Sequence, residues 1–247
     1  MIDMTLKQHD KNSSKDIVRG LIAVAIIGVV IAGLTMAYIW FSGGDGQASA
    51  AIVAPHLTTL PDDSRSLFHI VTDESEVRFY IDEMLLGKPT TVIGTTNQVA
   101  GDFLVDFESP TNSQLGAIRI NVRTLKTDNE FRNRALRGQI LEAEQDEFEY
   151  AEFIATELIG LPEAVSVGDT VNFQIVGNLR VHGITQTVSF DTSLTVISDT
   201  RLEGTALATV KHSDFGITIP EASGVANVSD ELQLEIEFVA QVENPTS

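Results

Sequence analysis

Apolar and polar residues alternate, one after the other, over most of residues 66–243. The clearest run is Glu231–Val242, where large apolar residues alternate with glutamate and glutamine. Because successive side chains of a β-strand point to opposite faces, this pattern predicts strands with one buried and one solvated face. Such alternation is typical of antiparallel sheets. Counting the runs predicts an all-β, antiparallel barrel of about eight strands, a size that can hold one small ligand.

One stretch breaks this two-residue period. Residues 128–141 are mostly helix formers, and Phe131, Leu136 and Ile140 form an apolar stripe at helical spacing. The first residue of the stretch, Asp128, or the threonine before it is a suitable N-cap. We therefore expect a short helical insertion that covers one end of the barrel.

A long apolar segment precedes the alternating region. Leu21–Phe41 is a run of 21 residues without a charge, and a helix of that length spans about 31 Å, the thickness of a bilayer core. All four flanking basic residues lie on its N-terminal side, so the positive-inside rule places the N-terminus in the cytoplasm. The alternative is a cleavable signal peptide, because Ala48-Ser49-Ala50 resembles a cleavage site. The length of the apolar run favours a retained anchor.

The region between the apolar segment and the barrel is small, polar and interrupted by two prolines. Such a composition predicts a flexible linker over residues 42–65. The expected organisation is a cytoplasmic tail (1–20), a transmembrane helix (21–41), this linker, and a barrel domain (66–243). The chain is thus predicted to be a single-pass membrane protein with an extracytoplasmic barrel, in the periplasm or at the cell surface.

Composition excludes several classes of function. Asp and Glu outnumber Lys and Arg by 35 to 16, and such an acidic chain repels the phosphates of nucleic acids. The chain has no cysteine, which excludes disulfides and thiol chemistry. The four histidines after the apolar segment are scattered, without the spacing of metal ligands, and no nucleophile motif is present; they are His56, His69, His182 and His212. We therefore expect no metal, no covalent cofactor and no catalysis.

Six of the twelve basic residues that follow residue 41 cluster in and just before the predicted helix. One interpretation is a cationic patch near the barrel mouth that binds a phosphate or quinone headgroup. The alternative is ion pairing along the helix, because Asp128 lies four residues before Arg132. Glu130 has the same spacing to Arg134. Arg137 has no partner at that spacing, so Arg137 and Arg132 are the predicted headgroup contacts, with a structural arginine as the alternative.

The acidic run Glu142–Glu152 lacks the ligand spacing of a calcium loop, and we expect a solvated loop there.

Four segments, in this order along the chain, carry a family resemblance. They are Thr127–Arg137, which ends in a Leu-Arg pair; the aromatic strand Phe148–Thr156; the Gly-x-Leu-x-x-x-Gly-Ile-Thr hairpin within Gly177–Gln186; and the Asp-Phe-Gly-Ile turn Asp214–Ile217. In these segments the chain from about Phe68 to Val242 resembles the YceI-like family. It departs from the family pattern at Asn133, at Ile140-Leu141 and at Glu149.

The resemblance implies an exported, lipocalin-like barrel whose apolar interior binds a long isoprenoid chain, such as the tail of a quinone or a polyprenyl lipid. The implied partner is thus a membrane lipid. The predicted cavity lining consists of inward-facing residues of the strands, namely Phe79, Phe103, Ile118, Ile120, Phe153, Phe173, Ile175, Phe190, Ala206, Ala208, Phe215, Ile236 and Phe238.

The same inward faces fit a filled core. Gly177 and Gly204, with Ala206 and Ala208, are expected to leave space beside the aromatic residues, which favours a cavity. The alternative is a filled barrel that serves as a structural or protein-interaction module. An enzyme acting on lipid or hydride-carrying substrates would need a cluster of titratable groups in one cleft. The oligomeric state is not determined by the sequence, and a homodimer is as compatible with it as a monomer.

Overall fold

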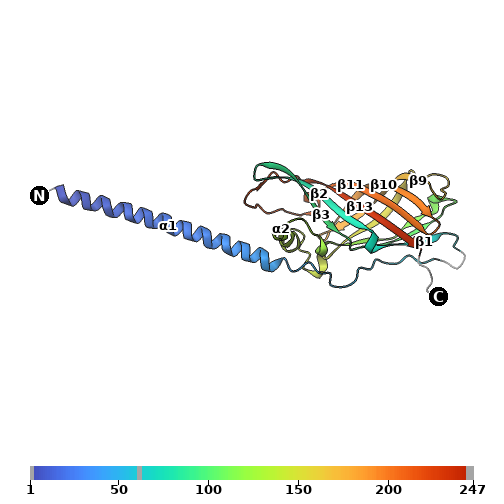
Figure 1. The fold of residues 1–247 in the computed structure, drawn as a ribbon, viewed down its shortest axis with the longest axis horizontal. Coiled ribbons are helices and arrows are strands. Elements are labelled where there is room, and N and C mark those ends of the chain that lie inside the picture. Colours follow the sequence, from blue (N-terminus) through green and yellow to red (C-terminus); the bar gives the residue numbers. More distant parts are fainter. Residues whose placement is uncertain (1–2, 60–62, 243–247) are drawn as a thin grey trace.

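The computed structural model describes residues 3–59 and 63–242, with side chains from Ile17 onward; the remaining parts of the predicted tail, linker and barrel end lie outside the described residues. A long N-terminal helix, α1 (Asp3–Ser42), leads to one end of a β-barrel (Figure 1). Within the described residues one helix, Ile17–Ser42, is long and apolar enough to cross a membrane, and none of it is buried. A signal sequence would meet the same criteria.

Within the described residues, thirteen antiparallel strands form a single sheet. They are β1 (Ser66–Ile70), β2 (Glu76–Leu85), β3 (Lys88–Thr96), β4 (Val99–Ala100), β5 (Asp102–Val105), β6 (Gln114–Leu115), β7 (Ile118–Asn121), β8 (Tyr150–Ile159), β9 (Thr170–Val181), β10 (Ile184–Ser198), β11 (Arg201–Lys211), β12 (Val225–Ala226) and β13 (Glu231–Val242). The predicted all-β antiparallel class is confirmed. The count exceeds eight in part because β4, β6 and β12 have two residues each, too few to produce a periodic signal.

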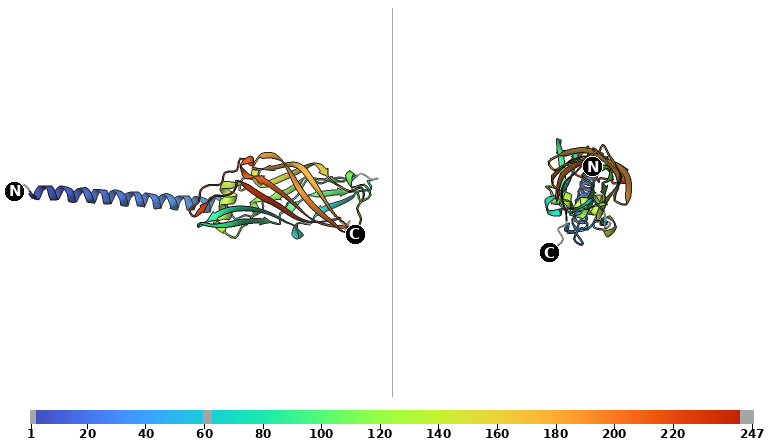
Figure 2. Two further views of the ribbon diagram at one scale, coloured as in Figure 1. Left: turned by 90° about the horizontal axis from the view of Figure 1, so that it is seen from above. Right: turned by 90° about the vertical axis from the view of Figure 1, so that its right-hand side faces the viewer.

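The sheet curls until its two ends meet. The strand order runs β4-β7-β8-β9-β10-β11-β13-β1-β5-β6, and β2 branches from β13 and carries β3 and β12. Strands β4 and β5 are consecutive parts of one segment on either side of Gly101. Since β4 pairs with β7 and β5 pairs with β1, this one segment joins both ends of the path. The end-on view in Figure 2 shows the resulting ring of strands.

The barrel interior is apolar. The largest cluster of buried residues draws on most of the strands, and a second, smaller cluster forms around Phe68, Val196, Leu202 and Ala240. These four residues lie near the ends of β1, β10, β11 and β13 that face away from α1 (Figure 1). Valine, isoleucine and phenylalanine make up most of the larger cluster, which fits the pleated surface of a strand.

The predicted helical insertion is present as a short helix, α2 (Glu130–Ala135), followed by one π-helical stretch, Leu136–Ile140. The N-cap is Asn129, whose side chain accepts a hydrogen bond from the Arg132 amide. Thr127 or Asp128 was the expected cap, and the difference is one or two residues. This insertion lies at the end of the barrel that faces α1 (Figure 1).

Residues 43–59, here called the strap, run along the outside of the barrel from α1 toward the start of β1 (Figure 1). The Ser49 amide donates to Glu149 Oε1 at 2.9 Å, the Val53 carbonyl accepts from Arg119 at 3.1 Å, and the Leu57 amide donates to Asp102 at 2.8 Å. The sequence predicts a flexible linker over residues 42–65. Side chains of the barrel supply partners for backbone groups of this strap. Its mobility in solution, and the domain boundaries drawn from the sequence, stay predictions.

Candidate functional site

The interior cavity is apolar and small. It has a volume of about 70 Å³ and lies between β5, β8, β9 and β10, with Phe103, Phe107, Leu158 and Phe173 among its lining residues. It lies toward the barrel end that faces away from α1 (Figure 1). A volume of this size corresponds to about two water molecules. Pockets for drug-sized ligands have volumes of about 300–1,000 Å³, so a long chain requires the interior to open.

The structure places all thirteen predicted lining residues in the barrel interior. Twelve belong to the main apolar cluster or pack against it, and Phe238 is buried and stacked on Phe103 at 5.4 Å between ring centroids. Three of them, Phe103, Phe173 and Ile175, line the cavity. Whether any of the thirteen binds a ligand stays a prediction.

Several cavity residues are absent from that predicted set. Phe107, Val171 and Leu194 line the cavity and stand in alternating runs, so the two-residue period signals their inward orientation. Leu161 and Val165 also line it, but they belong to the connection between β8 and β9. No periodic signal exists in such a loop.

Aromatic rings occupy the space beside the inward-facing glycines. A Cβ atom at Gly177 would lie 2.5 Å from the Phe153 ring, and one at Gly204 would lie 2.6 Å from the Phe238 ring. Gly94 is covered by the ring of Phe79 in the same way. The space expected beside Gly177 and Gly204 is therefore absent, because a ring from a neighbouring strand fills each of these two positions. A glycine without a side chain allows such close stacking of a ring on a strand.

The basic cluster around α2 forms ion pairs. Arg132 pairs with Asp128 at 2.7 Å and with Glu83 at 3.2 Å, and Arg134 pairs with Glu130 at 3.3 Å. Both pairs expected from the four-residue spacing are thus present. These residues lie at the barrel end that faces α1, whereas the cavity lies toward the other end (Figure 1). A headgroup contact by Arg132 stays a prediction.

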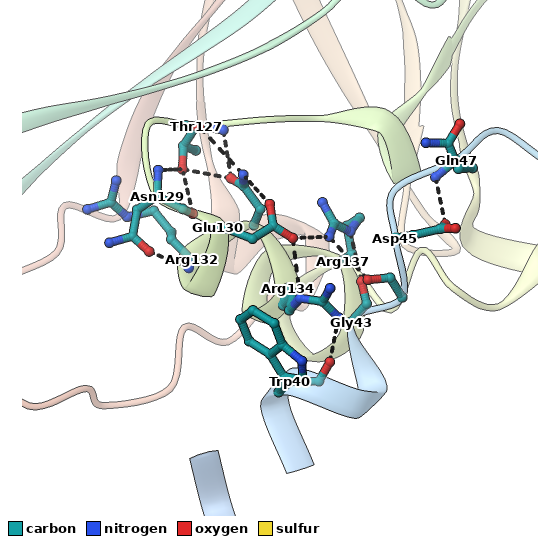
Figure 3. Close-up of polar contacts among 12 residues, drawn as sticks. Trp40, Gly43, Asp45, Gln47, Thr127, Asn129, Glu130, Arg132, Arg134 and Arg137 are labelled. Carbon is teal, nitrogen blue, oxygen red and sulfur yellow. Dashed lines mark hydrogen bonds and ion pairs between the residues drawn. The ribbon is translucent and has the colours of Figure 1, made fainter. Parts of the chain in front are cut away.

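Arg137 is buried and holds the beginning of the strap. Its side chain is 1% exposed, its Nε donates to the Gly43 carbonyl at 2.8 Å, and one of its terminal nitrogens lies 3.2 Å from Glu130 (Figure 3). Glu130 is seven residues earlier, which is two helical turns and therefore the same helix face. The four-residue spacing between adjacent helical turns therefore does not reveal this ion pair in the sequence. These contacts fit a structural role for Arg137. A headgroup contact needs an exposed guanidinium, whereas that of Arg137 is buried.

Arg134 joins the end of α1 to the barrel. Its guanidinium lies 4.1 Å from the centre of the Trp40 ring and also donates to the Trp40 carbonyl at 2.6 Å (Figure 3). A cation over an indole face is attracted by the ring quadrupole, and Trp is the strongest partner of this type. Through this contact the last turn of α1 is attached to the barrel domain.

Glu149 is the centre of a buried polar network. Its carboxylate accepts from the Ser49 hydroxyl at 2.6 Å and from Asn121 at 2.7 Å, and Arg123 lies 3.2 Å away. Burial raises the pKa of Glu149, but the hydrogen bonds from Ser49 and Asn121 and the charge of Arg123 together hold this pKa below its ordinary value. The expected solvated acidic loop is thus wrong at this position, because strap and barrel enclose the carboxylate.

Two histidines that are 13 residues apart in the sequence lie close together in the fold. His56 of the strap and His69 of β1 both contact the buried carboxylate of Asp102, and the candidate ligand atoms of all three lie within 4.8 Å of one another. The expectation of scattered histidines is wrong for this pair, because the strap passes beside β1. His182 occupies a turn with φ 49°.

Comparison with known proteins identifies the barrel. The sequence model of the YceI-like domain matches residues 68–240. The chain belongs to the YceI-like family. The match begins in β1 and ends in β13, so α1 and the strap of this YceI-like protein lie outside it. The predicted hairpin of the resemblance is the β9–β10 turn at His182-Gly183. The predicted Asp-Phe-Gly-Ile turn has Gly216 at φ +67°.

Solved structures share the fold of this YceI-like chain at low sequence identity. A polyisoprenoid binding domain from Saccharophagus degradans, implicated in plant cell wall breakdown, is 12% identical with a TM-score of 0.57, covering 71% of this chain and 98% of that one. BcnA from Burkholderia cenocepacia is 18% identical with a TM-score of 0.54, covering 70% and 99%. The YceI protein of Campylobacter jejuni is 15% identical with a TM-score of 0.50, covering 61% and 85%. A comparison with curated proteins finds no match.

Proposed function

We propose that this YceI-like barrel binds the isoprenoid chain of a membrane lipid, with a quinone or a polyprenyl lipid as the ligand class. One observation supports the proposal most. The interior cavity of this YceI-like barrel is bounded almost entirely by apolar side chains. A structural neighbour described as a polyisoprenoid binding domain has the same fold. Each methylene group removed from water contributes about 0.8 kcal/mol, so a long chain offsets the cost of opening a packed interior.

The proposed route into the interior is the cavity end of the barrel. The connection after β5 and the connection between β8 and β9 both contribute cavity residues. Connections tolerate displacement more readily than paired strands do. Asp106, Ser113 and Gln114 are the polar residues among the lining. A neutral headgroup that accepts and donates hydrogen bonds fits these side chains better than a phosphate does.

Native mass spectrometry of the full chain, purified from membranes in mild detergent, tests this proposal. We expect a bound mass that matches a prenyl lipid, and uptake of added ubiquinone by lipid-free protein. Val171→Phe places a ring in the cavity of about 70 Å³, so it should reduce uptake at least tenfold. Asn172→Ala, on the exposed face of the same strand, is the matched control and should retain uptake.

A second function is favoured by the small size of the cavity. A filled barrel is suited to a structural or protein-interaction role, displayed on the N-terminal helix. An open groove of about 560 Å³ on the wall formed by β8–β11 includes Ile159, Gln174 and Leu207. Protein that is free of lipid as purified, and that takes up no quinone, would contradict the lipid proposal and support this second role.

A further inference from the structure

The strap brings one histidine to the edge of the barrel where β1 pairs with β5. His69 of β1 stands opposite Asp102 of β5 in the antiparallel register. The strap passes this point at His56 and Leu57, and both residues contact Asp102. Three segments that are distant in sequence thus converge on one carboxylate.

Both carboxylate oxygens of Asp102 are in use. Oδ1 lies 2.7 Å from Nδ1 of His69. Oδ2 lies 3.2 Å from Nδ1 of His56 and accepts the Leu57 amide at 2.8 Å. The two imidazole rings are 5.9 Å apart and stand edge to face. Two imidazole nitrogens and one carboxylate are therefore held together before any ligand is present.

Within the described residues, no lysine or arginine pairs with this carboxylate. The Asp102 side chain is 4% exposed, and its ion-pair partners among those residues are the two histidines. A buried carboxylate is costly unless a positive charge lies beside it. A divalent cation bound between the three side chains would supply such a charge together with coordination.

We propose that His56, His69 and Asp102 form a binding site for one divalent transition metal ion of the Zn²⁺ class. Imidazole nitrogen together with carboxylate oxygen suits Zn²⁺ and its neighbours, whereas Mg²⁺ and Ca²⁺ prefer oxygen ligands alone. Ligand atoms of a tetrahedral zinc site are about 3.3 Å apart, given metal–ligand distances of about 2.0–2.1 Å. In this cluster His69 lies 2.7 Å from Oδ1 and His56 lies 3.2 Å from Oδ2, and the three candidate ligand atoms lie within 4.8 Å of one another, so the side chains must shift to reach that geometry.

The site has three protein ligands and leaves a fourth position for water. The His56 side chain is 67% exposed, so this position faces solvent. His69 and Asp102 come from paired strands, which hold them rigidly, and His56 comes from the strap, which can adjust. A bound metal ion fastens the strap to the barrel and fixes the barrel relative to α1. This inference is independent of lipid binding.

Isothermal titration of the full chain with ZnCl₂ tests the site, using tag-free protein in detergent after treatment with a chelator. We expect one saturable site, at least tenfold weaker in His56→Ala and in His69→Ala, and no comparable binding of Mg²⁺. His212→Ala is the matched control, because His212 also lies beside an aspartate, Asp230, at 3.6 Å. It should bind Zn²⁺ as the unmodified protein does.

Hydrogen exchange supplies a second, local measurement. Zn²⁺ should slow exchange of the Leu57 amide at least tenfold, and this protection should be absent in His56→Ala. His56 is exposed and outside the barrel, so this variant is expected to fold, which circular dichroism checks. Zinc binding that is absent, or that is unchanged in folded His56→Ala, would overturn the proposal and leave a hydrogen-bonded clasp without metal.

Discussion

The ring of Phe153 on β8 covers the backbone of Gly177 on the neighbouring strand β9, and the two are so close that a Cβ atom at Gly177 would lie 2.5 Å from the ring. The same arrangement occurs where Gly204 stands opposite Phe238 in the register of β11 and β13. Rings stacked on glycines fill space that a larger residue would otherwise occupy. This packing keeps the interior cavity small although the barrel contains many small residues.

Gly177→Ala should therefore destabilise the barrel by about 1–3 kcal/mol, since the added methyl group meets both a ring and a backbone carbonyl. Chemical denaturation monitored by circular dichroism measures the loss. Asn172→Ala, at an exposed position of the same strand, is the control and should change the stability by no more than about 0.5 kcal/mol. Equal stabilities of the two variants would show that the ring moves aside at no cost.

Acidification should remove the contribution of Glu149 to stability. The pKa of this residue is held below its ordinary value in the folded protein, so its ionised form stabilises the fold above the unfolded-state pKa of about 4.3. This stabilisation is lost as the pH falls through the lower pKa of the folded state. Glu149→Gln should cost about 3 kcal/mol near pH 6, and the gap to the unmodified protein should shrink below about pH 4.

Unfolding midpoints measured at several pH values check this expectation. Glu147→Gln is the matched control, because Glu147 is exposed in the same loop, and its effect should stay within about 0.5 kcal/mol at every pH. A gap for Glu149→Gln that is independent of pH would mean that the carboxylate charge is not what stabilises the network.

Arg137→Met should release the start of the strap. The variant keeps much of the side-chain volume but leaves the Gly43 carbonyl without its donor, at a cost of about 1–3 kcal/mol. Hydrogen exchange over residues 43–49 should become faster. Arg201→Met, which removes a partly exposed ion pair with Glu74, should leave that exchange unchanged.

The same Arg137→Met variant tests the headgroup hypothesis. Faster strap exchange with unchanged lipid occupancy is the result that the buried contacts favour. Lost lipid occupancy with unchanged strap exchange would instead support a headgroup contact by Arg137.

The membrane topology can be tested with introduced cysteines, because the chain contains none of its own. Asp199→Cys lies in the exposed β10–β11 turn, and Asn12→Cys precedes the apolar segment. In intact cells a membrane-impermeant maleimide should label Asp199→Cys at once, and Asn12→Cys only after permeabilisation. A mature protein that has lost the residue-12 cysteine would show that the helix is a cleaved signal peptide.

Much of the architecture is readable from local sequence patterns. The two-residue alternation depends only on neighbouring residues, and it predicts the strands of the barrel. The length of the uncharged run before it predicts the membrane-compatible helix. The inward orientation of residues such as Phe103 and Phe190 follows from the same period. The helix at Glu130–Ala135 is also readable, because helix formers and an apolar stripe interrupt the alternation.

The long-range partners of the polar residues depended on the tertiary structure alone, unlike the two ion pairs at four-residue spacing in α2. Arg137 reaches back 94 residues to Gly43, and Glu149 reaches back 100 residues to Ser49. His56 meets Asp102 across 46 residues. Such contacts depend on strand register and on the course of the strap, and neither property leaves a periodic signal. The filling of the interior also depends on strand register. A glycine in the sequence predicts open space, but the fold places an aromatic ring of the neighbouring strand in that space.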